Sequence, residues 1–448
     1  MQLVSDSGPS SNDNDPDDEF DFASLFEQLG GGGDANAMLS SLMSLLGGGF
    51  GGITGGGLDS ALNLAISIAT QGKTEPNVDP VDRIAMEQLA RVAELQIGNA
   101  TGLPTSTGAP LTIAPVTRAD WVRKSMQAYK PLLEQMAAAL AGPDSTEQPT
   151  DPQMAMFNQL FASMRPMMVN MTTGSMIGQV GSRALGTYDL PIPRPGTTEL
   201  LVVVPNLDAF GGEWSLDKDE LRLWIALSEV AHHVVLNIPA VAERLNSLLT
   251  NYTEAFARNP NGLGNALESF EPTGDMNDIA GLQKQLQDMF GDPSALIGSM
   301  RSPEQEELLP HISAIIAVVV GYVDHIMDVV GSNLISSYSQ LTEALRRRRV
   351  TTAESDRFVE RLLGLEIDQA LYDRGRAFVD GIVERAGDDG LAKLWESDET
   401  LPTPNEIGAP GLWLSRMDID FEIEVDPAEL AALDDFLKET EGDEGEEE

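Results

Sequence analysis

The segment from residue 217 to residue 239 constrains the fold of this chain more than any other stretch. Asp217 and Glu220 are suited to cap the start of a helix, and Pro239 ends one because proline cannot continue the hydrogen-bond ladder. The apolar residues between them recur at helical spacing and form one stripe: Leu221, Trp224, Leu227, Ala231 and Val235. This pattern predicts a buried helix, and Ser228 falls on its inward-facing stripe.

Three polar residues on this helix bear on metal chemistry. In the pattern His-Glu-x-x-His, two histidines four residues apart bind Zn²⁺ and the glutamate acts as general base on the metal-bound water. Glu229 and His232 stand at the base and second-ligand positions, whereas Ser228 stands at the first-ligand position. A serine hydroxyl is neutral at pH 7 and is a poor zinc ligand beside imidazole or carboxylate. Because Glu-x-x-His alone is a common pattern, the alternative is a buried helix with one satisfied histidine.

Composition limits the kinds of site that the chain can form. It has 448 residues, of which 42% are hydrophobic, so it can bury a sizeable core in one large domain or two ordinary ones. There is no cysteine, which excludes disulfides, thiolate metal ligands and cysteine nucleophiles. The four histidines lie in two segments: His232, His233, His311 and His325.

The formal net charge of -43 argues against two classes of partner. An acidic surface repels nucleic acid and anionic membranes, so we expect neither as a partner. The N-terminus lacks the basic and apolar regions of a signal peptide. The most apolar stretch, Ala314 to Val323, is too short to span a bilayer. We therefore expect a cytoplasmic protein whose charge reflects a solvated acidic surface rather than a specific basic partner.

Composition also predicts three regions along the chain. Residues 1–79 are glycine-rich and acidic and are expected to be disordered. Residues 80–433 carry repeated helical patterns and are expected to form the folded domain. Residues 434–448 are an acidic tail, again expected to be disordered.

Within the folded domain most segments are predicted to be helical. The segment that begins at Pro80 is expected to bury an apolar face made of Ile84, Leu89, Val92 and Leu95. The methionine-rich residues 154–171 are interpreted as packing core rather than as a peptide groove. The spaced glycines between 174 and 186 are expected to allow close contact between helices.

One strand and one long helix complete the expected architecture. Residues Glu199 to Asn206 form the best strand candidate, to which a substrate peptide could add by β-augmentation. Residues Pro310 to Val330 predict a long buried helix. The basic run Arg346–Arg349 is expected to be solvated or to pair with acidic residues. The predicted fold is mainly α with a small β element.

From about Pro115 to Arg416 the chain resembles zincin-like proteins of actinobacteria, which are described as zinc-dependent metalloproteases or hydrolases. The resemblance rests on short stretches that occur in the same order: Tyr188-Asp189-Leu190, Leu201–Asn206, Leu223–His233, Gly321-Tyr322-Val323-Asp324, Leu363-Gly364-Leu365, Tyr372 with Gly375 and Phe378, Trp395-Glu396, Leu401-Pro402-Thr403, and Trp413 with Arg416. It implies a zincin-like helical domain.

The resemblance also implies a set of site residues. The family has His-Glu-x-x-His on one helix and, on a later helix, a glutamate ligand directly before a glycine-aromatic pair. The equivalent positions in this chain are Ser228, Glu229, His232 and Val320, which are expected to lie together. Zinc is the cofactor that the family implies, but two of its three ligand positions are replaced here.

Two further residues could substitute for the missing ligands. Asp324 lies one helical turn beyond Val320, and His325 follows it; both could instead make ordinary polar contacts. We therefore favour a member of this metalloprotease family that is degenerate, weakly active or non-catalytic, binds a peptide or protein, and lacks zinc or holds it weakly. The alternatives are an active peptidase with an altered metal site and a helical interaction scaffold.

Overall fold

The computed structural model describes residues 58–419, except 107, 142–172, 195, 259–300, 352–359 and 362. All of these residues belong to one compact unit, which begins at Gly56. The methionine-rich segment 154–171 and the acidic tail 434–448 lie outside the described residues.

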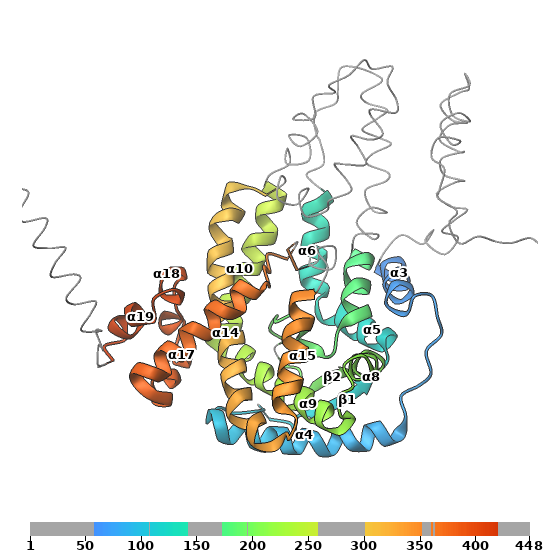
Figure 1. Ribbon diagram of the computed structural model, residues 1–448. Coiled ribbons are helices and arrows are strands. Elements are labelled where there is room, and N and C mark those ends of the chain that lie inside the picture. The colour runs from blue at the N-terminus through green and yellow to red at the C-terminus, as the bar shows by residue number, and fades with distance from the viewer. Residues whose placement is uncertain are drawn as a thin grey trace, which may run out of the picture. The chain divides into compact units, whose positions relative to one another are not determined.

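Helices make up most of the regular structure (Figure 1). They are α3 (Leu58–Thr70), α4 (Pro80–Thr101), α5 (Arg118–Ala128), α6 (Lys130–Ala141), a helix at 173–183, α8 (Val204–Glu213), α9 (Lys218–Leu236), α10 (Pro239–Arg258), α14 (Pro303–Leu334), α15 (Tyr338–Thr351), α17 (Gln369–Ala392), α18 (Pro404–Ile407) and α19 (Pro410–Arg416), with 3₁₀ turns η1 (Thr187–Asp189), η2 (Lys393–Trp395) and η3 (Asp398–Thr400). Two strands, β1 (Thr112–Val116) and β2 (Glu199–Val203), form one small sheet. The predicted mainly α fold with a small β element is confirmed.

The sheet is parallel, and β2 is the strand that the sequence predicted. The register of β1 against β2 runs from Thr112 opposite Glu199 to Val116 opposite Val203. β2 ends earlier than expected because α8 starts at Val204, with proline in its first turn. The other edge of β2 is also paired, since Gly186 bridges Val202 and the Val203 N–H donates to the Leu185 carbonyl at 2.9 Å. A peptide therefore cannot add to β2 at these two valines.

The prediction that residues 1–79 are disordered is wrong for the part that begins at residue 58. Helix α3 buries Ala61, Ala65 and Ala69 in the core. It lies against the helix at 173–183, where a Cβ on Gly174 would come within 2.6 Å of the Ala61 carbonyl oxygen and one on Gly178 within 2.8 Å of the Ala65 carbonyl oxygen. The glycines thus allow the close helix contact that their spacing predicted, and small side chains can form a core without large apolar residues.

The predicted apolar face of α4 is wrong for three of its four residues, because only Leu89 is half-buried against the core. Ile84, Val92 and Leu95 are exposed, whereas the buried face carries Met86, Ala90, Ala93 and Ile97. Helix α4 starts where expected, with Asp79 as its N-cap. It packs against α9 and β1, and the alanines allow its backbone to lie close to both. The larger side chains therefore point away from the core.

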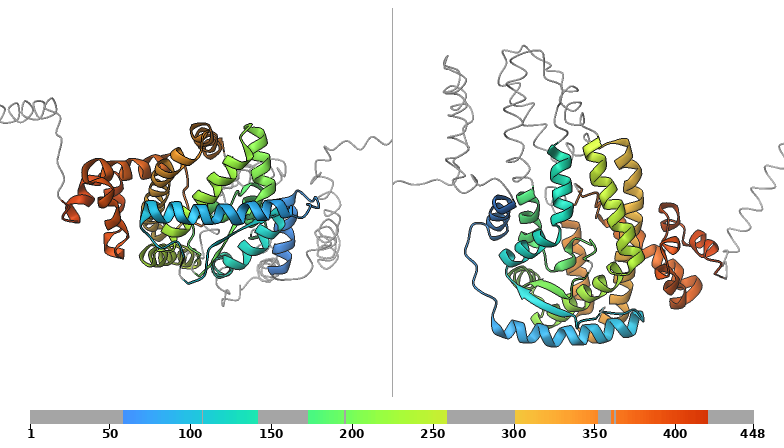
Figure 2. Two further views of the ribbon diagram at one scale, coloured as in Figure 1. Left: turned by 90° about the horizontal axis from the view of Figure 1, so that it is seen from below. Right: turned by 180° about the vertical axis from the view of Figure 1, so that it is seen from behind.

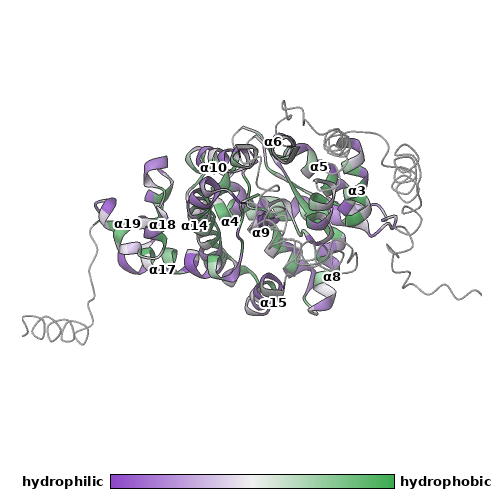
Figure 3. Cartoon of the chain, turned by 90° about the horizontal axis from the view of Figure 1, so that it is seen from above, coloured by the Kyte–Doolittle hydropathy of each residue, from purple (hydrophilic) through white to green (hydrophobic). Residues whose placement is uncertain are grey.

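Helix α14 is the longest element and packs against α9, α10 and α17. Its contact with α17 depends on two glycines: a Cβ on Gly375 would overlap the carbonyl of Ala317, and one on Gly321 would overlap the backbone of Gly375. Its length and apolar composition would suffice to span a membrane, but 78% of its most apolar window is buried inside the protein. Outer helices such as α8 and α15 show hydrophilic residues on their outward turns (Figure 3).

Candidate active site

Helix α9 carries the site residues that the sequence predicted. Asp217 caps it by accepting hydrogen bonds from the Asp219 and Glu220 N–H groups, both at 3.0 Å. The Glu220 side chain instead accepts from the backbone N–H groups of residues 336 and 337, so it ties α9 to the start of α15. The helix is buried along most of its length, including Ser228 and Glu229.

The Glu229 carboxylate contacts the backbone of a neighbouring turn. It accepts hydrogen bonds from the Thr187 N–H at 2.8 Å and the Tyr188 N–H at 3.3 Å. The preceding residue must be glycine, because a Cβ on Gly186 would overlap the Glu229 carboxylate. In this chain Glu229 therefore anchors the turn at 186–188.

This environment changes the acidity of Glu229. Burial, followed by the charge of Asp189, raises the pKa of the Glu229 carboxyl to about 8, against the opposing effect of the backbone hydrogen bonds. A carboxyl with this pKa is mostly protonated at neutral pH. A free carboxylate acting as general base is therefore not the dominant state of Glu229.

We predict that Glu229 makes the stability of the protein depend on pH. Its folded pKa lies above the ordinary value of 4.5, so the folded state holds the proton more tightly and its stability falls as pH rises from about 4.5 to about 8. Glu229→Gln should remove this component. The difference in unfolding free energy between parent and variant should change by up to about 1.4 kcal/mol per pH unit across that window.

Urea unfolding at pH values between 5 and 8.5 measures this effect. Glu243→Gln is the matched control, because it removes the same charge from an exposed position on α10, away from Glu229. A difference between parent and Glu229→Gln that stays constant with pH would contradict the prediction.

His232 is oriented by the backbone of its own helix. Its Nδ1 donates to the Ser228 carbonyl at 2.8 Å, and the Ser228 hydroxyl lies 3.4 Å from the same nitrogen. This hydrogen bond leaves Nε2 as the electron-pair donor of the ring. Burial lowers the pKa of His232 below its ordinary value, which favours the neutral imidazole. His232 thus retains the form that a metal ligand requires.

The next histidine belongs to a separate polar group that the sequence did not single out. His233 Nδ1 lies 2.9 Å from the Tyr188 hydroxyl and 3.0 Å from Asn237 Nδ2. Asn237 also donates to the Tyr188 hydroxyl at 3.2 Å. Burial lowers the pKa of His233 to about 4. A neutral His233 therefore helps to fix Tyr188 beside Glu229.

Asp324 and His325, the two predicted substitutes, have different partners. Both Asp324 carboxylate oxygens accept from the Arg349 guanidinium, at 3.0 and 3.1 Å. Arg349 also lies over the ring of Tyr372, 4.1 Å from its centroid. The charges of Asp324 and Arg349 both act on the pKa of His232, in opposite directions. His325 pairs with Asp388 of α17 at 3.4 Å.

Val320 is the position at which the resemblance expects the third ligand. It is buried on α14, one turn before Asp324, and α14 packs against α9. Asp324 and Arg349 line a cavity of about 30 Å³ that also includes Trp224. This volume holds about one water molecule and no peptide side chain.

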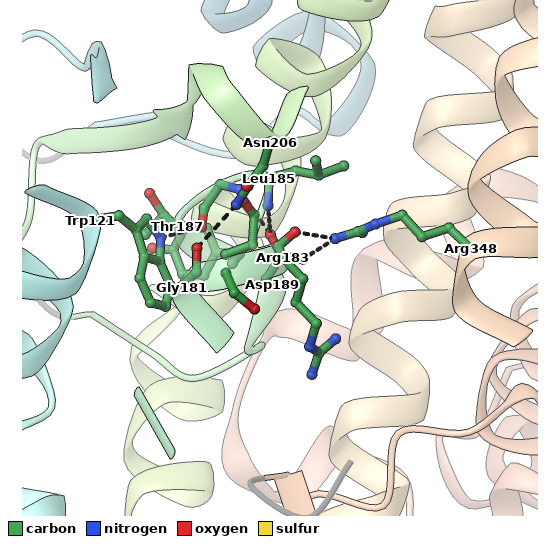
Figure 4. A network of polar contacts seen from close by, with 12 residues as sticks. Trp121, Gly181, Arg183, Leu185, Thr187, Asp189, Asn206 and Arg348 are labelled. Carbon is green, nitrogen blue, oxygen red and sulfur yellow. Dashed lines mark hydrogen bonds and ion pairs between the residues drawn. The ribbon is translucent and has the colours of Figure 1, made fainter. Parts of the chain in front are cut away.

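The turn that contacts Glu229 is held from several sides (Figure 4). Asp189 accepts from the Leu185 and Gly186 N–H groups and pairs with Arg348 of α15 at 3.3 Å. Two side chains from other helices bind the backbone of the same region: the Trp121 indole donates to the Gly186 carbonyl at 2.7 Å, and Asn206 donates to the carbonyls of Gly181 and Ala184. Arg348 and Arg349 thus confirm that the basic run pairs with acidic residues.

The described residues do not fit a zinc ion. Nowhere among them do three or more histidine, aspartate or glutamate side chains gather as a metal site would require. Glu229 is engaged by backbone N–H groups and Asp324 by Arg349. Ser228 offers only a neutral hydroxyl, which leaves His232 as a single good donor.

Comparisons with known proteins agree on the fold. A solved structure from Chloroflexus aurantiacus, described as a "putative hydrolase with a novel fold", superimposes with a TM-score of 0.57 and 21% sequence identity, covering 81% of this chain and 99% of its own. The comparison with curated proteins found no match. The family model for zincin-like metallopeptidases matches residues 58–414. Because this match spans most of the chain, including α9 and α14, the protein belongs to the zincin-like metallopeptidase family.

Proposed function

We propose that this chain is a non-catalytic or weakly active member of its family that has kept the site's framework and serves to bind a peptide or protein. The observation that carries the proposal is that both carboxylates expected to work with His232 already have protein partners. Glu229 accepts from the turn at 186–188, and Asp324 is bound through both oxygens by Arg349. With Ser228 and Val320 at the other two positions, the motif is degenerate.

The chemistry of the site supports the loss of hydrolysis. A general base in such an enzyme needs a water whose pKa a metal has lowered. Glu229 is buried and mostly protonated at neutral pH, because burial raises its pKa to about 8. Its two backbone hydrogen bonds give it a structural role that does not need water.

A separate pocket supports a binding role. It has a volume of about 550 Å³ and lies between the segment at 71–79, the start of α8 and α5. This size falls within the range of ligand sites, roughly 300 to 1,000 Å³. Both signs of charge line it: the cations are Lys73 and Arg118, and the carboxylates are Glu75, Asp79, Asp82 and Asp208. Arg118 is paired with Glu75, and Asp208 with Lys218. We propose that a short peptide segment binds here. We also propose that the protein is cytoplasmic and that its net charge of -43 keeps nucleic acid and anionic membranes from being its partners.

The alternative is an active peptidase with an altered metal site. It is favoured by one feature: Asp324 lies near enough to His232 for its charge to raise the pKa of that histidine, against the larger lowering effect of burial. Asp324 would have to leave Arg349 to serve as a ligand, at the cost of an ion pair with two hydrogen bonds.

Metal content distinguishes the two functions. Protein purified without chelators should hold far less than one zinc per chain, and added zinc should leave its unfolding temperature unchanged. Stoichiometric zinc, together with zinc-dependent stabilisation, would favour the altered-site peptidase, since a ligand that binds only the folded state raises stability.

A further inference from the structure

The outward face of α4 is apolar although it lies at the surface. Val81 is 66% exposed, Ile84 58%, Val92 40% and Leu95 60%. These four residues, called the α4 stripe below, make up most of the exposed large hydrophobic side chains in the described part of the chain. In the view from below, α4 crosses in front of the other elements (Figure 2). A patch of this kind on a charged protein indicates an interaction surface.

The stripe has the geometry of a helix-pairing seam. At about 100° per residue, Val81, Ile84, Gln88, Val92 and Leu95 lie within roughly 80° of one another. The buried face of α4, from Asp82 to Ile97, lies on the opposite side of the helix. The α4 stripe runs for about 21 Å along the axis. A narrow apolar seam of this length is typical of a helix that packs against a second helix.

The spacing of the stripe is the same in both directions. When Gln88 is counted at the centre of the stripe, the intervals from Val81 to Leu95 are three, four, four and three residues. If two copies of α4 pair antiparallel about a two-fold axis at Gln88, Val81 faces Leu95 of the second copy and Ile84 faces Val92. The central Gln88 then faces its own counterpart, and two amides can hydrogen-bond to each other.

The charges beside the stripe fit the same arrangement. Glu87 and Arg91 are both exposed and border one side of the seam. In the antiparallel pair, Arg91 of one copy and Glu87 of the other lie on the same side of the seam and differ by about 3 Å along the axis, within reach of an ion pair, and the reverse contact follows from the symmetry. An isologous interface requires this kind of self-complementary surface.

From this geometry we propose that two copies of the chain associate through the α4 stripe, with their α4 helices antiparallel. The large negative charge of each copy opposes the association, so the dimer tightens when salt screens the repulsion. Sedimentation of the full chain should show a dimer. Its dissociation constant should be lower in 0.5 M NaCl, where salt screens the repulsion between the two copies, than at low salt, where the repulsion is not screened.

Ile84→Glu tests the surface itself. It should weaken the dimer by about 100-fold or more, because each interface receives two charges in place of two apolar side chains. Ile84 is exposed in the monomer, so at low protein concentration the Ile84→Glu variant should unfold at the same temperature as the parent. Val329→Glu, at an exposed valine of α14 that is 45% accessible, is the matched control and should leave the dimer intact.

Single cysteines test the orientation, since the chain has none of its own. Under oxidation Gln88→Cys should form a disulfide-linked dimer, because the two-fold axis brings the two positions together. Val81→Cys alone should not, but a mixture with Leu95→Cys should form a crosslinked heterodimer. A parent that stays monomeric at all salt concentrations, a dimer that Ile84→Glu does not weaken, or a Val81→Cys protein that crosslinks to itself would each overturn the proposal. The parent would stay monomeric if residues 1–57 of the same chain, or another protein, covered the α4 stripe.

Discussion

Replacing Arg349 by methionine is expected to lower the free energy of unfolding by roughly 2 to 3 kcal/mol. Arg349 holds both oxygens of Asp324, and both side chains are about one quarter exposed. Removing the guanidinium leaves the aspartate partly buried without its cation, which costs more than the net value of the pair. The substitution also removes the cation from the face of the Tyr372 ring.

A double-mutant cycle with Asp324→Asn separates the pair from the rest of the effect. The double variant should be less destabilised than the sum of the two single variants, because neither group is then left alone. Arg347→Met is the matched control on the same helix: Arg347 is 60% exposed and pairs with Glu343 one turn away, so its loss should change stability by about 0.5 kcal/mol or less. Additive effects of the two single substitutions would show that the pair contributes no coupling.

The extent to which the site could be predicted depends on the range of the interactions that form it. The start and end of α9, and the burial of Ser228, follow from capping residues and apolar spacing within one helix. The contacts of Glu229 do not, since Tyr188 lies 41 residues away in sequence. Asp324 and Arg349 are 25 residues apart. The packing of η1 against α9, and of α15 against α14, brings these groups together. The sequence pattern therefore indicates Asp324 as a candidate without revealing its partner.

Helix α4 shows a second limit of sequence patterns. The larger apolar residues suggested one face as the core, but the buried face is built around Ala90 and Ala93. Close packing against α9 and β1 favours small side chains, and these also recur at helical spacing. A pattern that counts only large hydrophobic residues therefore assigns the wrong face. The same bias explains why the sequence pattern predicts disorder for α3, whose buried hydrophobic residues are all alanines: Ala61, Ala65 and Ala69.

Ser228→His combined with Val320→Glu is expected to give the chain a zinc site with three protein ligands. Three protein ligands and one water form the usual tetrahedral arrangement, and two protein ligands hold zinc poorly. His232 is already held by the Ser228 backbone carbonyl with Nε2 as its electron-pair donor. Without metal, a carboxylate at the buried position 320 should cost roughly 2 kcal/mol or more. Zinc at about 100 times its dissociation constant should return about 2.7 kcal/mol, because it binds the folded state.

Arg349 bears on zinc binding in this variant, because its guanidinium holds Asp324, which lies one helical turn beyond position 320. It competes with zinc for the new carboxylate, so adding Arg349→Met to the double variant should strengthen zinc binding further. Thermal unfolding with zinc or with EDTA, on the parent, both single variants, the double and the triple, measures the series. Each single substitution should gain less than the double. A folded double variant with no more zinc-dependent stabilisation than the parent would show that positions 228 and 320 do not meet at His232, and that the framework of the family's metal site has been lost along with its ligands.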